Sequence, residues 1–271
     1  MGFRAALRRH WPEYLIEAGL LGAFMCSALG MTVLLEHPAS PIRAALPEPL
    51  PRRALMGLAM GATAVALVYS PFGQRSGAHF NPALTLAYLR LRKVEPADAL
   101  GYVLAQFVGG VAGVLAIAAL LGARVAAPEV HWAATRPGAA GAGVAFAAES
   151  AISFVTMLTV LVVSNQPRLA RYTPLFVGAL VASWITFEAP LSGMSMNPAR
   201  TFASASGAHA FGSLWLYFTA PLLGMFAAAE LFVRTRGARA VRCAKLHHEN
   251  AQPCIFRCGY RRQEAGWTAT T

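Results

Sequence analysis

The sequence contains little charge for its length. Asp, Glu, Lys and Arg together make up 13% of the 271 residues, against about 25% in soluble globular domains. The mean hydropathy is +0.48, and 56% of the residues are hydrophobic. This scarcity of charge excludes an ordinary soluble domain and indicates a protein that lies in a membrane.

Acidic residues and cysteines are scarcer still. The chain has 12 Asp and Glu against 23 Lys and Arg, which gives a net charge of +11, and it has four cysteines. Cys26 lies in an apolar run, where we predict a small buried hydrophobic side chain. A basic balance of this size can indicate nucleic-acid binding, so the placement of the basic residues has to decide between nucleic acid and lipid.

Six apolar runs are long enough to cross a bilayer, which takes about 20 residues. The first run is too long for the core of a signal peptide and lacks a convincing cleavage site, so we expect it to be retained. Six spans place both chain ends on one side of the membrane. The runs cover residues 14–35, 53–70, 97–121, 143–164, 172–189 and 212–233.

Most of the 23 basic residues fall on the side that holds both termini, in the N-terminal lead, three short loops and the tail after residue 233. The positive-inside rule makes this side cytoplasmic. We therefore expect these residues to set topology and contact lipid headgroups rather than nucleic acid. The expected location is the plasma membrane or an inner cell membrane. Stable disulfides are not expected in a cytoplasmic tail.

Two similar segments interrupt the apolar runs. Ser76-Gly-Ala-His-Phe-Asn-Pro-Ala and Ser192-Gly-Met-Ser-Met-Asn-Pro-Ala each precede an apolar run that is too short to span. Asparagine is a good helix N-cap, and proline is favoured in the first helical turn. Asn81 and Asn197 are therefore predicted to begin half-length helices, with the positive dipole ends at the asparagines. Such re-entrant segments can line a cavity at membrane depth.

The segments Asn81-Pro82-Ala83 and Asn197-Pro198-Ala199, the second followed by Arg200, resemble the paired signature of the aquaporin or major intrinsic protein family. The resemblance covers about residues 10–235 and stops before the tail. It implies an all-α membrane protein with six transmembrane helices and two re-entrant half-helices in an inverted repeat, assembled as a homotetramer. We divide the chain into a cytoplasmic segment 1–13, a channel domain 14–235 (repeat one 14–121, linker 122–142, repeat two 143–235) and a basic cytoplasmic tail 236–271.

The resemblance also implies roles near the two motifs. Asn81 and Asn197 should present side-chain NH₂ groups to a molecule at the pore centre. The two positive helix ends should repel cations and protons, as in aquaporin-type pores generally. Backbone carbonyls of the two loops are expected to line the pore, at Gly77, Ala78, His79, Gly193, Met194 and Ser195.

Three glutamates are predicted to support the re-entrant loops. Glu17 and Glu149 match buried glutamates of the family and should accept hydrogen bonds from loop N–H groups, which would otherwise remain unsatisfied at roughly 1–3 kcal/mol each. The open alternative is a proton relay in a coupled transporter. Glu188 lies three residues after Ile185 on one helix face. It is expected to accept from the second loop or from Arg200, the alternative being an exposed position.

By resemblance, a selectivity filter combines Arg200 with Met60, Ile185 and Met194, and Gly61 is the alternative to Met60. Water-selective members usually have Phe and His at the first two positions, and this sequence has neither. The apolar filter therefore predicts leakage of small neutral solutes. Thr201 stands where glycerol facilitators usually have Asp, which favours the water-channel side.

The tail contains a weaker motif. Cys243 and His247 are four residues apart, as are Cys254 and Cys258, so each pair would share a face of a short helix. Three thiolates and one imidazole can form a structural zinc site. The competing hypotheses are a loose basic tail with incidental cysteines, and redox or disulfide chemistry of the three thiols. No other cofactor is expected.

We therefore predict a non-enzymatic, passive channel for water and small neutral solutes that excludes ions and protons. Ser76 and His79 do not indicate a hydrolase, because neither a third orienting group nor an oxyanion site is apparent. A glycerol- or ammonia-type channel is the alternative within the class. The alternatives outside it are a proton-coupled transporter using Glu17 and Glu149, and a non-conducting membrane interaction protein.

Overall fold

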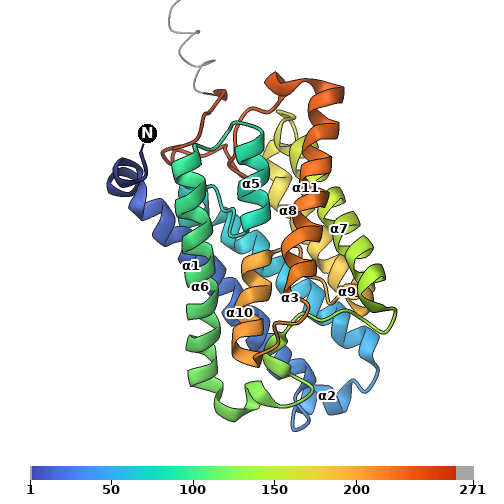
Figure 1. Ribbon diagram of the computed structural model, residues 1–271. Coiled ribbons are helices and arrows are strands. Elements are labelled where there is room, and N and C mark those ends of the chain that lie inside the picture. Colours follow the sequence, from blue (N-terminus) through green and yellow to red (C-terminus); the bar gives the residue numbers. More distant parts are fainter. Residues whose placement is uncertain (1, 261–271) are drawn as a thin grey trace, which may run out of the picture.

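The computed structural model describes residues 2–260 and, within them, consists of helices without a strand. Figure 1 shows the long helices as a bundle in which the N-terminus and the segment after the last long helix lie at the same end. The long elements are α1 (Phe3–Glu36), α3 (Pro49–Tyr69), α6 (Pro96–Leu121), α7 (Gly141–Ser164), α8 (Thr173–Ser183) and α11 (Leu214–Arg236).

The helices reproduce the six predicted spans with shifted ends. Five helical segments of the described chain are long and apolar enough to cross a membrane. Helix α3 adds a sixth long segment, which carries Arg52 and Arg53 in its first turns. Helix α1 begins at Phe3, so the predicted N-terminal lead is part of the first helix. The fifth span does not stop before Pro190, because that proline lies in the first turn of α9 (Ala189–Ser192).

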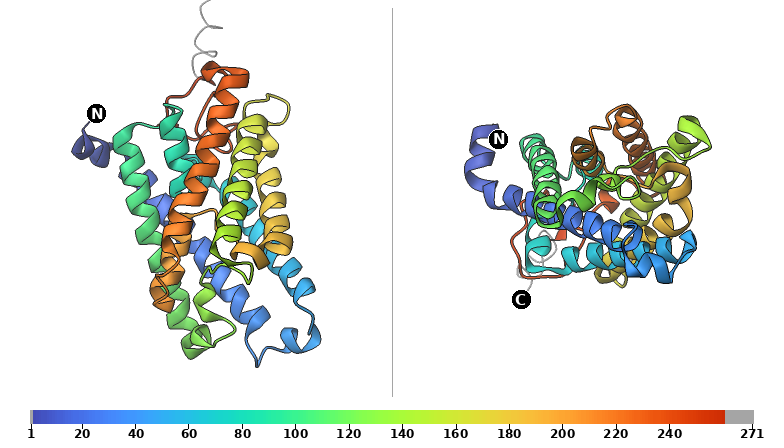
Figure 2. Two further views of the ribbon diagram at one scale, coloured as in Figure 1. Left: turned by 45° about the vertical axis from the view of Figure 1, so that its right-hand side comes forward. Right: turned by 90° about the horizontal axis from the view of Figure 1, so that it is seen from below.

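The two re-entrant half-helices are α5 (Pro82–Arg90) and α10 (Pro198–Ala208). The Asn81 side chain caps α5 by accepting from Ala83 N–H, and Asn197 caps α10 by accepting from the N–H groups of Ala199 and Arg200. The half-helices lie in opposite halves of the bundle, with α5 in the half that holds the N-terminus (Figure 1 and Figure 2). Their capped ends therefore meet near the middle of the molecule.

Close helix contacts build each repeat in the same way. Helix α1 packs along α6 in the first repeat and α7 along α11 in the second, while α3 packs against α8 between the repeats. A Cβ on Gly109 of α6 would lie 2.1 Å from the carbonyl oxygen of Ala18, and one on Gly224 of α11 would lie 2.2 Å from that of Ser150. Both contacts are thus backbone-to-backbone approaches that require glycine.

Short elements connect the long helices. Helix α4 (Pro71–Ser76) leads into the first re-entrant loop, and the Ser70 side chain accepts from Gly73 N–H as its N-cap. The remaining short elements are α2 (Pro41–Ala45), η1 (Gly122–Ala126), η2 (His131–Ala133), η3 (Ala170–Tyr172), the π-helical turn η4 (Trp184–Glu188) and η5 (Ala238–Ala240).

The segment after α11 differs from the loose tail of the competing hypothesis. Residues 237–260 pack on the end of the bundle that holds the N-terminus, beside α5 (Figure 1), and Cys243, Ala244 and Leu246 are at most 3% exposed. These side chains join the core formed by α1, α5, α6 and α11. The final residues of the predicted tail, 261–271, lie outside the described part of the chain.

Candidate functional site

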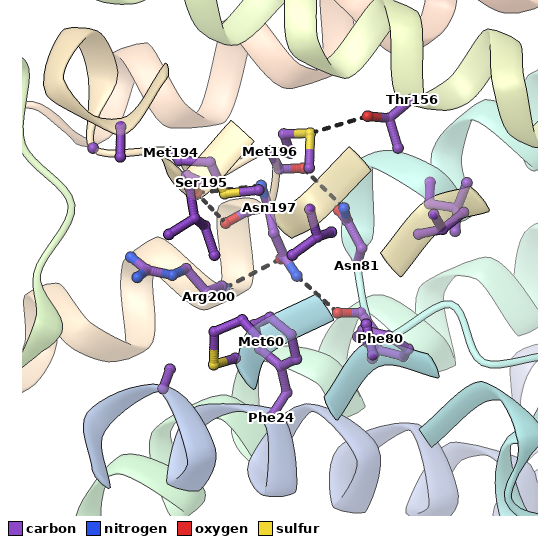
Figure 3. A pocket seen from close by; sticks show the side chains of 18 of the residues that line it. Phe24, Met60, Phe80, Asn81, Thr156, Met194, Ser195, Met196, Asn197 and Arg200 are labelled. Carbon is purple, nitrogen blue, oxygen red and sulfur yellow. Dashed lines mark hydrogen bonds between the residues drawn. The ribbon is translucent and has the colours of Figure 1, made fainter. Parts of the chain in front are cut away.

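A cavity of about 260 Å³ lies where the half-helices meet, and both repeats line it. Figure 3 shows the two asparagines next to each other in this cavity, with Met60, Met194 and Arg200 nearby. The structure thus brings together residues that are far apart in the sequence. Those predicted for the pore centre and filter that line the cavity are Asn81, Asn197, Met60, Ile185, Met194 and Arg200.

The two asparagines link the loops across the cavity. Asn81 Nδ2 donates to the carbonyl of Met196, and Asn197 Nδ2 donates to the carbonyl of Phe80; the donor–acceptor distance is 2.8 Å in both hydrogen bonds. A carboxamide NH₂ carries two donors. The crosslink uses one of them on each asparagine, so one N–H per amide remains for a molecule in the cavity.

The two loops before the asparagines share an unusual backbone. Ala78 and Phe80 have φ of 56° and 28°, and Met194 and Met196 have φ of 48° and 53°. A left-handed conformation costs roughly 1–2 kcal/mol for a residue with a Cβ. The alternation turns successive carbonyls to different sides, so the loops leave acceptors for a passing molecule, but tertiary contacts must hold them in place.

Glu17 and Glu149 supply those contacts in matching fashion. Glu17 accepts from His79 N–H at 3.0 Å and Phe80 N–H at 2.6 Å. Glu149 accepts from Ser195 N–H at 2.6 Å and Met196 N–H at 2.8 Å. Both side chains are fully buried, and the loop hydrogen bonds expected from the sequence are present.

Other polar groups complete the support and have no counterpart among the sequence predictions. The Tyr102 hydroxyl donates to the carbonyl of Ser76, and the Tyr217 hydroxyl donates to the carbonyl of Ser192. Gln106 Nε2 donates to Glu17 over 2.8 Å. Tyr102 follows Asn81 at nearly the spacing by which Tyr217 follows Asn197, so a comparison of the repeats could have identified it.

The geometry favours Met60 over Gly61 as the cavity-lining residue. A Cβ on Gly61 would lie 2.5 Å from the carbonyl oxygen of Gly178, so Gly61 faces α8 rather than the cavity. Arg200 lines the cavity, and its guanidinium donates to the hydroxyl of Thr135. Thr135 belongs to the predicted linker, and nothing in its sequence context indicated a partner for Arg200.

Methionine side chains form a large part of the cavity wall. Six of the chain's 9 methionines contact the cavity, and four of them were not predicted from the sequence. Methionine is apolar, polarizable and unbranched, so it forms smooth walls that offer little hydrogen bonding. The four additional methionines are Met56, Met157, Met196 and Met225.

The prediction for Glu188 is wrong. Among the described residues, neither of its buried carboxylate oxygens has a hydrogen-bond partner. The loop donors that it was expected to meet bind Glu149 instead, and the nearby Ser192 hydroxyl also donates to Glu149. Arg200 turns to Thr135. The alternative of an exposed side chain is wrong as well, because Glu188 is 8% exposed.

The predicted lining of the first loop is correct only in part. His79 contacts the cavity, as do Gly193, Met194 and Ser195 of the second loop. Gly77 and Ala78 are not among the cavity-lining residues of the described chain. The Gly77 carbonyl instead accepts a hydrogen bond from Leu246 N–H at a distance of 3.2 Å, so the C-terminal segment covers this part of the loop.

The predicted metal ligand His247 is also replaced. Ligand atoms of Cys243, Cys254 and Cys258 lie within 4.8 Å of one another and of the neighbouring residue His248. His247 stays outside the cluster and packs edge-on against Tyr69. The segment is not the short helix on which the four-residue spacing was based, so spacing did not identify the face.

Comparisons with known proteins agree with this geometry. The family model described as major intrinsic protein matches residues 13–232. Glycerol uptake facilitator protein-like 6 of Lactiplantibacillus plantarum is 35% identical over 220 residues, which cover 80% of this chain and 94% of that protein. Aquaporin NIP1-3 of Oryza sativa subsp. japonica is 37% identical over 171 residues, 62% of this chain and 57% of that protein.

Solved structures show the same fold. The aquaglyceroporin from Plasmodium falciparum superposes with a TM-score of 0.69 at 18% identity, over 85% of this chain and 98% of that chain. The two chains therefore share one fold.

Proposed function

The chain belongs to the major intrinsic protein family, and from this premise we propose that the cavity around Asn81 and Asn197 is the conducting pore. The protein is a multi-pass membrane protein and a passive channel for water and small neutral solutes. The observation that carries the pore assignment is the pair of capped half-helices whose asparagines meet in a cavity lined from both repeats.

Conduction needs only the hydrogen bonds that this wall offers. The remaining N–H of each asparagine amide donates to the oxygen of a water molecule at the centre. Loop carbonyls accept its protons on either side, as at Ser195 and His79. No bond is made or broken, so the osmotic or chemical gradient sets the direction of flow.

Ion and proton exclusion follows from the charge distribution. The N-terminal ends of α5 and α10 place two positive dipole ends at the centre, and Arg200 adds a full positive charge to the same cavity. Glu17 and Glu149 direct their oxygens to loop N–H groups, and the carboxylate of the cavity-lining Glu36 is already paired with Arg52. A neutral solute meets no such barrier.

The filter is proposed to combine one strong donor with apolar walls. Arg200 supplies the donor, and Met60, Ile185 and Met194 supply the walls. An apolar wall cannot replace the hydrogen bonds that a polar solute loses on leaving water. None of these three filter residues has an aromatic ring that would narrow the pore at its position, so small neutral solutes pass beside water.

We propose that the protein lies in the plasma membrane or an inner cell membrane, with both termini in the cytoplasm. We also propose that it forms a homotetramer with one pore per subunit. The basic loops and tail support the orientation through the positive-inside rule. The apolar outer face of α6 supports assembly or lipid contact, with Leu104, Val108 and Leu115 each at least 51% exposed.

Stopped-flow light scattering on proteoliposomes tests the proposal. We expect osmotic water flux well above that of protein-free liposomes, a low activation energy, and no dependence on a pH gradient. Tetramers without water flux would indicate a non-conducting interaction protein. Flux that requires a proton gradient, and is lost in Glu17→Gln, would indicate the coupled transporter.

A glycerol-type channel is the second candidate. The 35% identical relative from Lactiplantibacillus plantarum is named a glycerol uptake facilitator-like protein, and the methionine-lined filter suits a carbon backbone. Glycerol influx in the same liposomes separates the two candidates. A glycerol flux that far exceeds the water flux would assign the channel to this class.

A further inference from the structure

The C-terminal segment after α11 contains a set of metal ligands outside the channel family's matched region, which ends at residue 232. One ligand atom from each of Cys243, His248, Cys254 and Cys258 lies within 4.8 Å of the other three. The sulfurs of Cys243 and Cys254 are 3.5 Å apart, and Cys258 Sγ lies 3.0 Å from His248 Nε2.

These separations are close to those of ligands around a tetrahedral zinc ion: the 3.5 Å between Cys243 and Cys254 matches, and the 3.0 Å between Cys258 and His248 is about 0.5 Å shorter. Bonds of about 2.3 Å to sulfur and about 2.0–2.1 Å to nitrogen place neighbouring tetrahedral ligands roughly 3.5–3.8 Å apart. Three cysteines and one histidine form a common closed structural set for zinc. The 3.5 Å between Cys243 and Cys254 exceeds the roughly 2.05 Å of a disulfide, and a single disulfide would leave the third cysteine and the histidine unexplained.

The surroundings hold the histidine ring in place. The His248 ring stacks on Tyr260 at a centroid distance of 4.3 Å, and the Tyr260 hydroxyl donates to the carbonyl of Ser164 at the end of α7. Such outer contacts orient metal-binding histidines. His247 has no equivalent position, since its ring packs on Tyr69 and Asn250 caps its carbonyl.

The segment has little secondary structure to hold it in place. Within residues 237–259, the only helical element is the three-residue turn Ala238–Ala240, yet Cys243 and Leu246 are 3% exposed. Arg257 ties the segment to Glu95 through a 2.6 Å ion pair, and this hydrogen bond lowers the pKa of Glu95. A metal ion would supply the missing order, because in such segments binding energy is folding energy.

The segment covers the end of the pore nearest the N-terminus. Leu246 lines the cavity, and the carbonyl of Ala244 lies 2.8 Å from Nε2 of the cavity-lining His79. Phe256 stacks on the same ring, with a centroid distance of 5.3 Å and an angle of 6°. In the sequence, Leu246 lies between Cys243 and His248, and Phe256 lies between Cys254 and Cys258. The metal ligands and the residues that cover the pore therefore belong to one small unit.

We propose that Cys243, His248, Cys254 and Cys258 bind one Zn²⁺, and that the ion holds Leu246 and Phe256 over this end of the pore. The metal site stands on the ligand geometry alone. The covering role rests on the proposed function, because it assumes that the cavity conducts.

Metal analysis of the purified, tag-free, full-length protein tests the site. Under reducing conditions without chelator, we expect inductively coupled plasma mass spectrometry to find close to one zinc ion per chain. His248→Ala and Cys254→Ser/Cys258→Ser should lose most of it. His247→Ala and Cys26→Ser are matched controls that should keep it, because neither residue belongs to the cluster.

A second measurement keeps the test informative when a variant folds poorly. The parent protein, stripped of metal and reloaded with Co²⁺, should show the thiolate absorption of a tetrahedral site, and His248→Ala should change it while His247→Ala should not. Parent protein that holds neither zinc nor cobalt after incubation and desalting contradicts the site. Loss of metal in His247→Ala but not in His248→Ala contradicts the ligand assignment.

Stopped-flow water permeability tests the covering role. Removal of zinc with a membrane-permeant chelator, or His248→Ala, should raise the osmotic permeability of proteoliposomes roughly twofold or more if the segment limits access to the pore, and His247→Ala should match the parent. Equal permeability with bound and removed zinc would refute the covering role. Absence of conduction in the parent and in every variant, with zinc bound to the parent, would instead refute the proposed channel function.

Discussion

At the scale of single residues, buried carboxylates decide the shape of the pore. Glu17 and Glu149 occupy equivalent positions in the two repeats and accept from two consecutive loop N–H groups each. Those loops contain alanine, phenylalanine and methionine in left-handed conformations. The hydrogen bonds offset this backbone strain, which is the physical reason for placing a charge inside the membrane.

Glu149→Gln should therefore loosen the second loop. The amide offers one acceptor and turns a donor toward loop N–H groups, so hydrogen bonds worth about 1.5–3 kcal/mol to a charged acceptor are weakened. We expect a clearly lower unfolding temperature in detergent and reduced water flux. Glu48→Gln is the control, because Glu48 is exposed and caps nothing. An unchanged unfolding temperature for Glu149→Gln would argue against the loop-supporting role.

The filter assignment predicts a change of selectivity at Ile185. Ile185→His should narrow the pore and add a donor opposite Arg200, which lowers the glycerol-to-water permeability ratio roughly tenfold. Stopped-flow measurements with both solutes give the ratio. Phe187→His is the matched control on the same helical stretch, since Phe187 is 72% exposed. Equal ratios in the two well-folded variants would remove Ile185 from the filter.

The central barrier predicts an ionic phenotype at the asparagines. Asn197→Asp places a carboxylate at the positive end of α10, and Asn81→Asp does the same at α5. We expect measurable cation conductance in planar bilayers, with water flux retained. Asn165→Asp, at the end of α7 and away from the cavity, should stay cation-tight. Cation-tight, water-conducting Asp variants at both central positions would contradict the electrostatic barrier.

At the scale of elements, glycine sets how closely the helices of each repeat approach. Helix α6 meets α1 at Gly109 and Gly113, where a Cβ would lie 2.1 Å from Ala18 O and 2.3 Å from Gly22 O. The same relation holds between α11 and α7 at Gly224. Because α1 and α7 carry Glu17 and Glu149, these contacts also fix the distance from each carboxylate to its loop.

Gly109→Ala tests this contact against a neutral glycine. The added methyl group collides with backbone that cannot move away, so we expect destabilisation of about 1–3 kcal/mol, measured by thermal or chemical unfolding in detergent. Gly30→Ala is the control, because nothing lies within 4 Å of its Cβ position. That substitution should be neutral or slightly stabilising in a helix. Similar stability of the two variants would show that α1 and α6 do not depend on a glycine contact.

At the scale of the whole molecule, the inverted repeat places two positive helix ends at one point and closes the bundle around them. The six long helices leave large apolar side chains on the outside, including Leu120 at 79% and Leu58 at 64% exposure. Lipid or other copies of the chain must cover such a surface.

The proposed tetramer gives a direct prediction of mass. Native mass spectrometry from mild detergent should show a species of four 28.7 kDa chains. Val108→Arg on the exposed face of α6 should shift the population toward smaller species if that face lies between subunits, because an unpaired buried charge is costly. Tetramers that persist in this variant would assign the α6 face to lipid, and monomers in the parent would contradict the assembly.

The sequence by itself determined the features that depend on local chemistry. Apolar runs of sufficient length specify helices that span, because the bilayer leaves the backbone no other way to satisfy its hydrogen bonds. Asn-Pro at positions 81–82 and 197–198 specifies helix starts, because capping and the fixed φ of proline act within a few residues. The six spans and both half-helices therefore follow from the sequence.

Only the tertiary structure decided which distant groups meet. The loop donors expected for Glu188 bind Glu149 instead, and Glu188 has no hydrogen-bond partner among the described residues. Arg200 donates a hydrogen bond to Thr135, which lies 65 residues away in the sequence. In the tail, His248 rather than His247 faces the cysteines, because contacts with the first loop and α7, not helical spacing, set the path of the segment. Side-chain partnerships of this kind depend on the packing of whole elements, which no local pattern of residues contains.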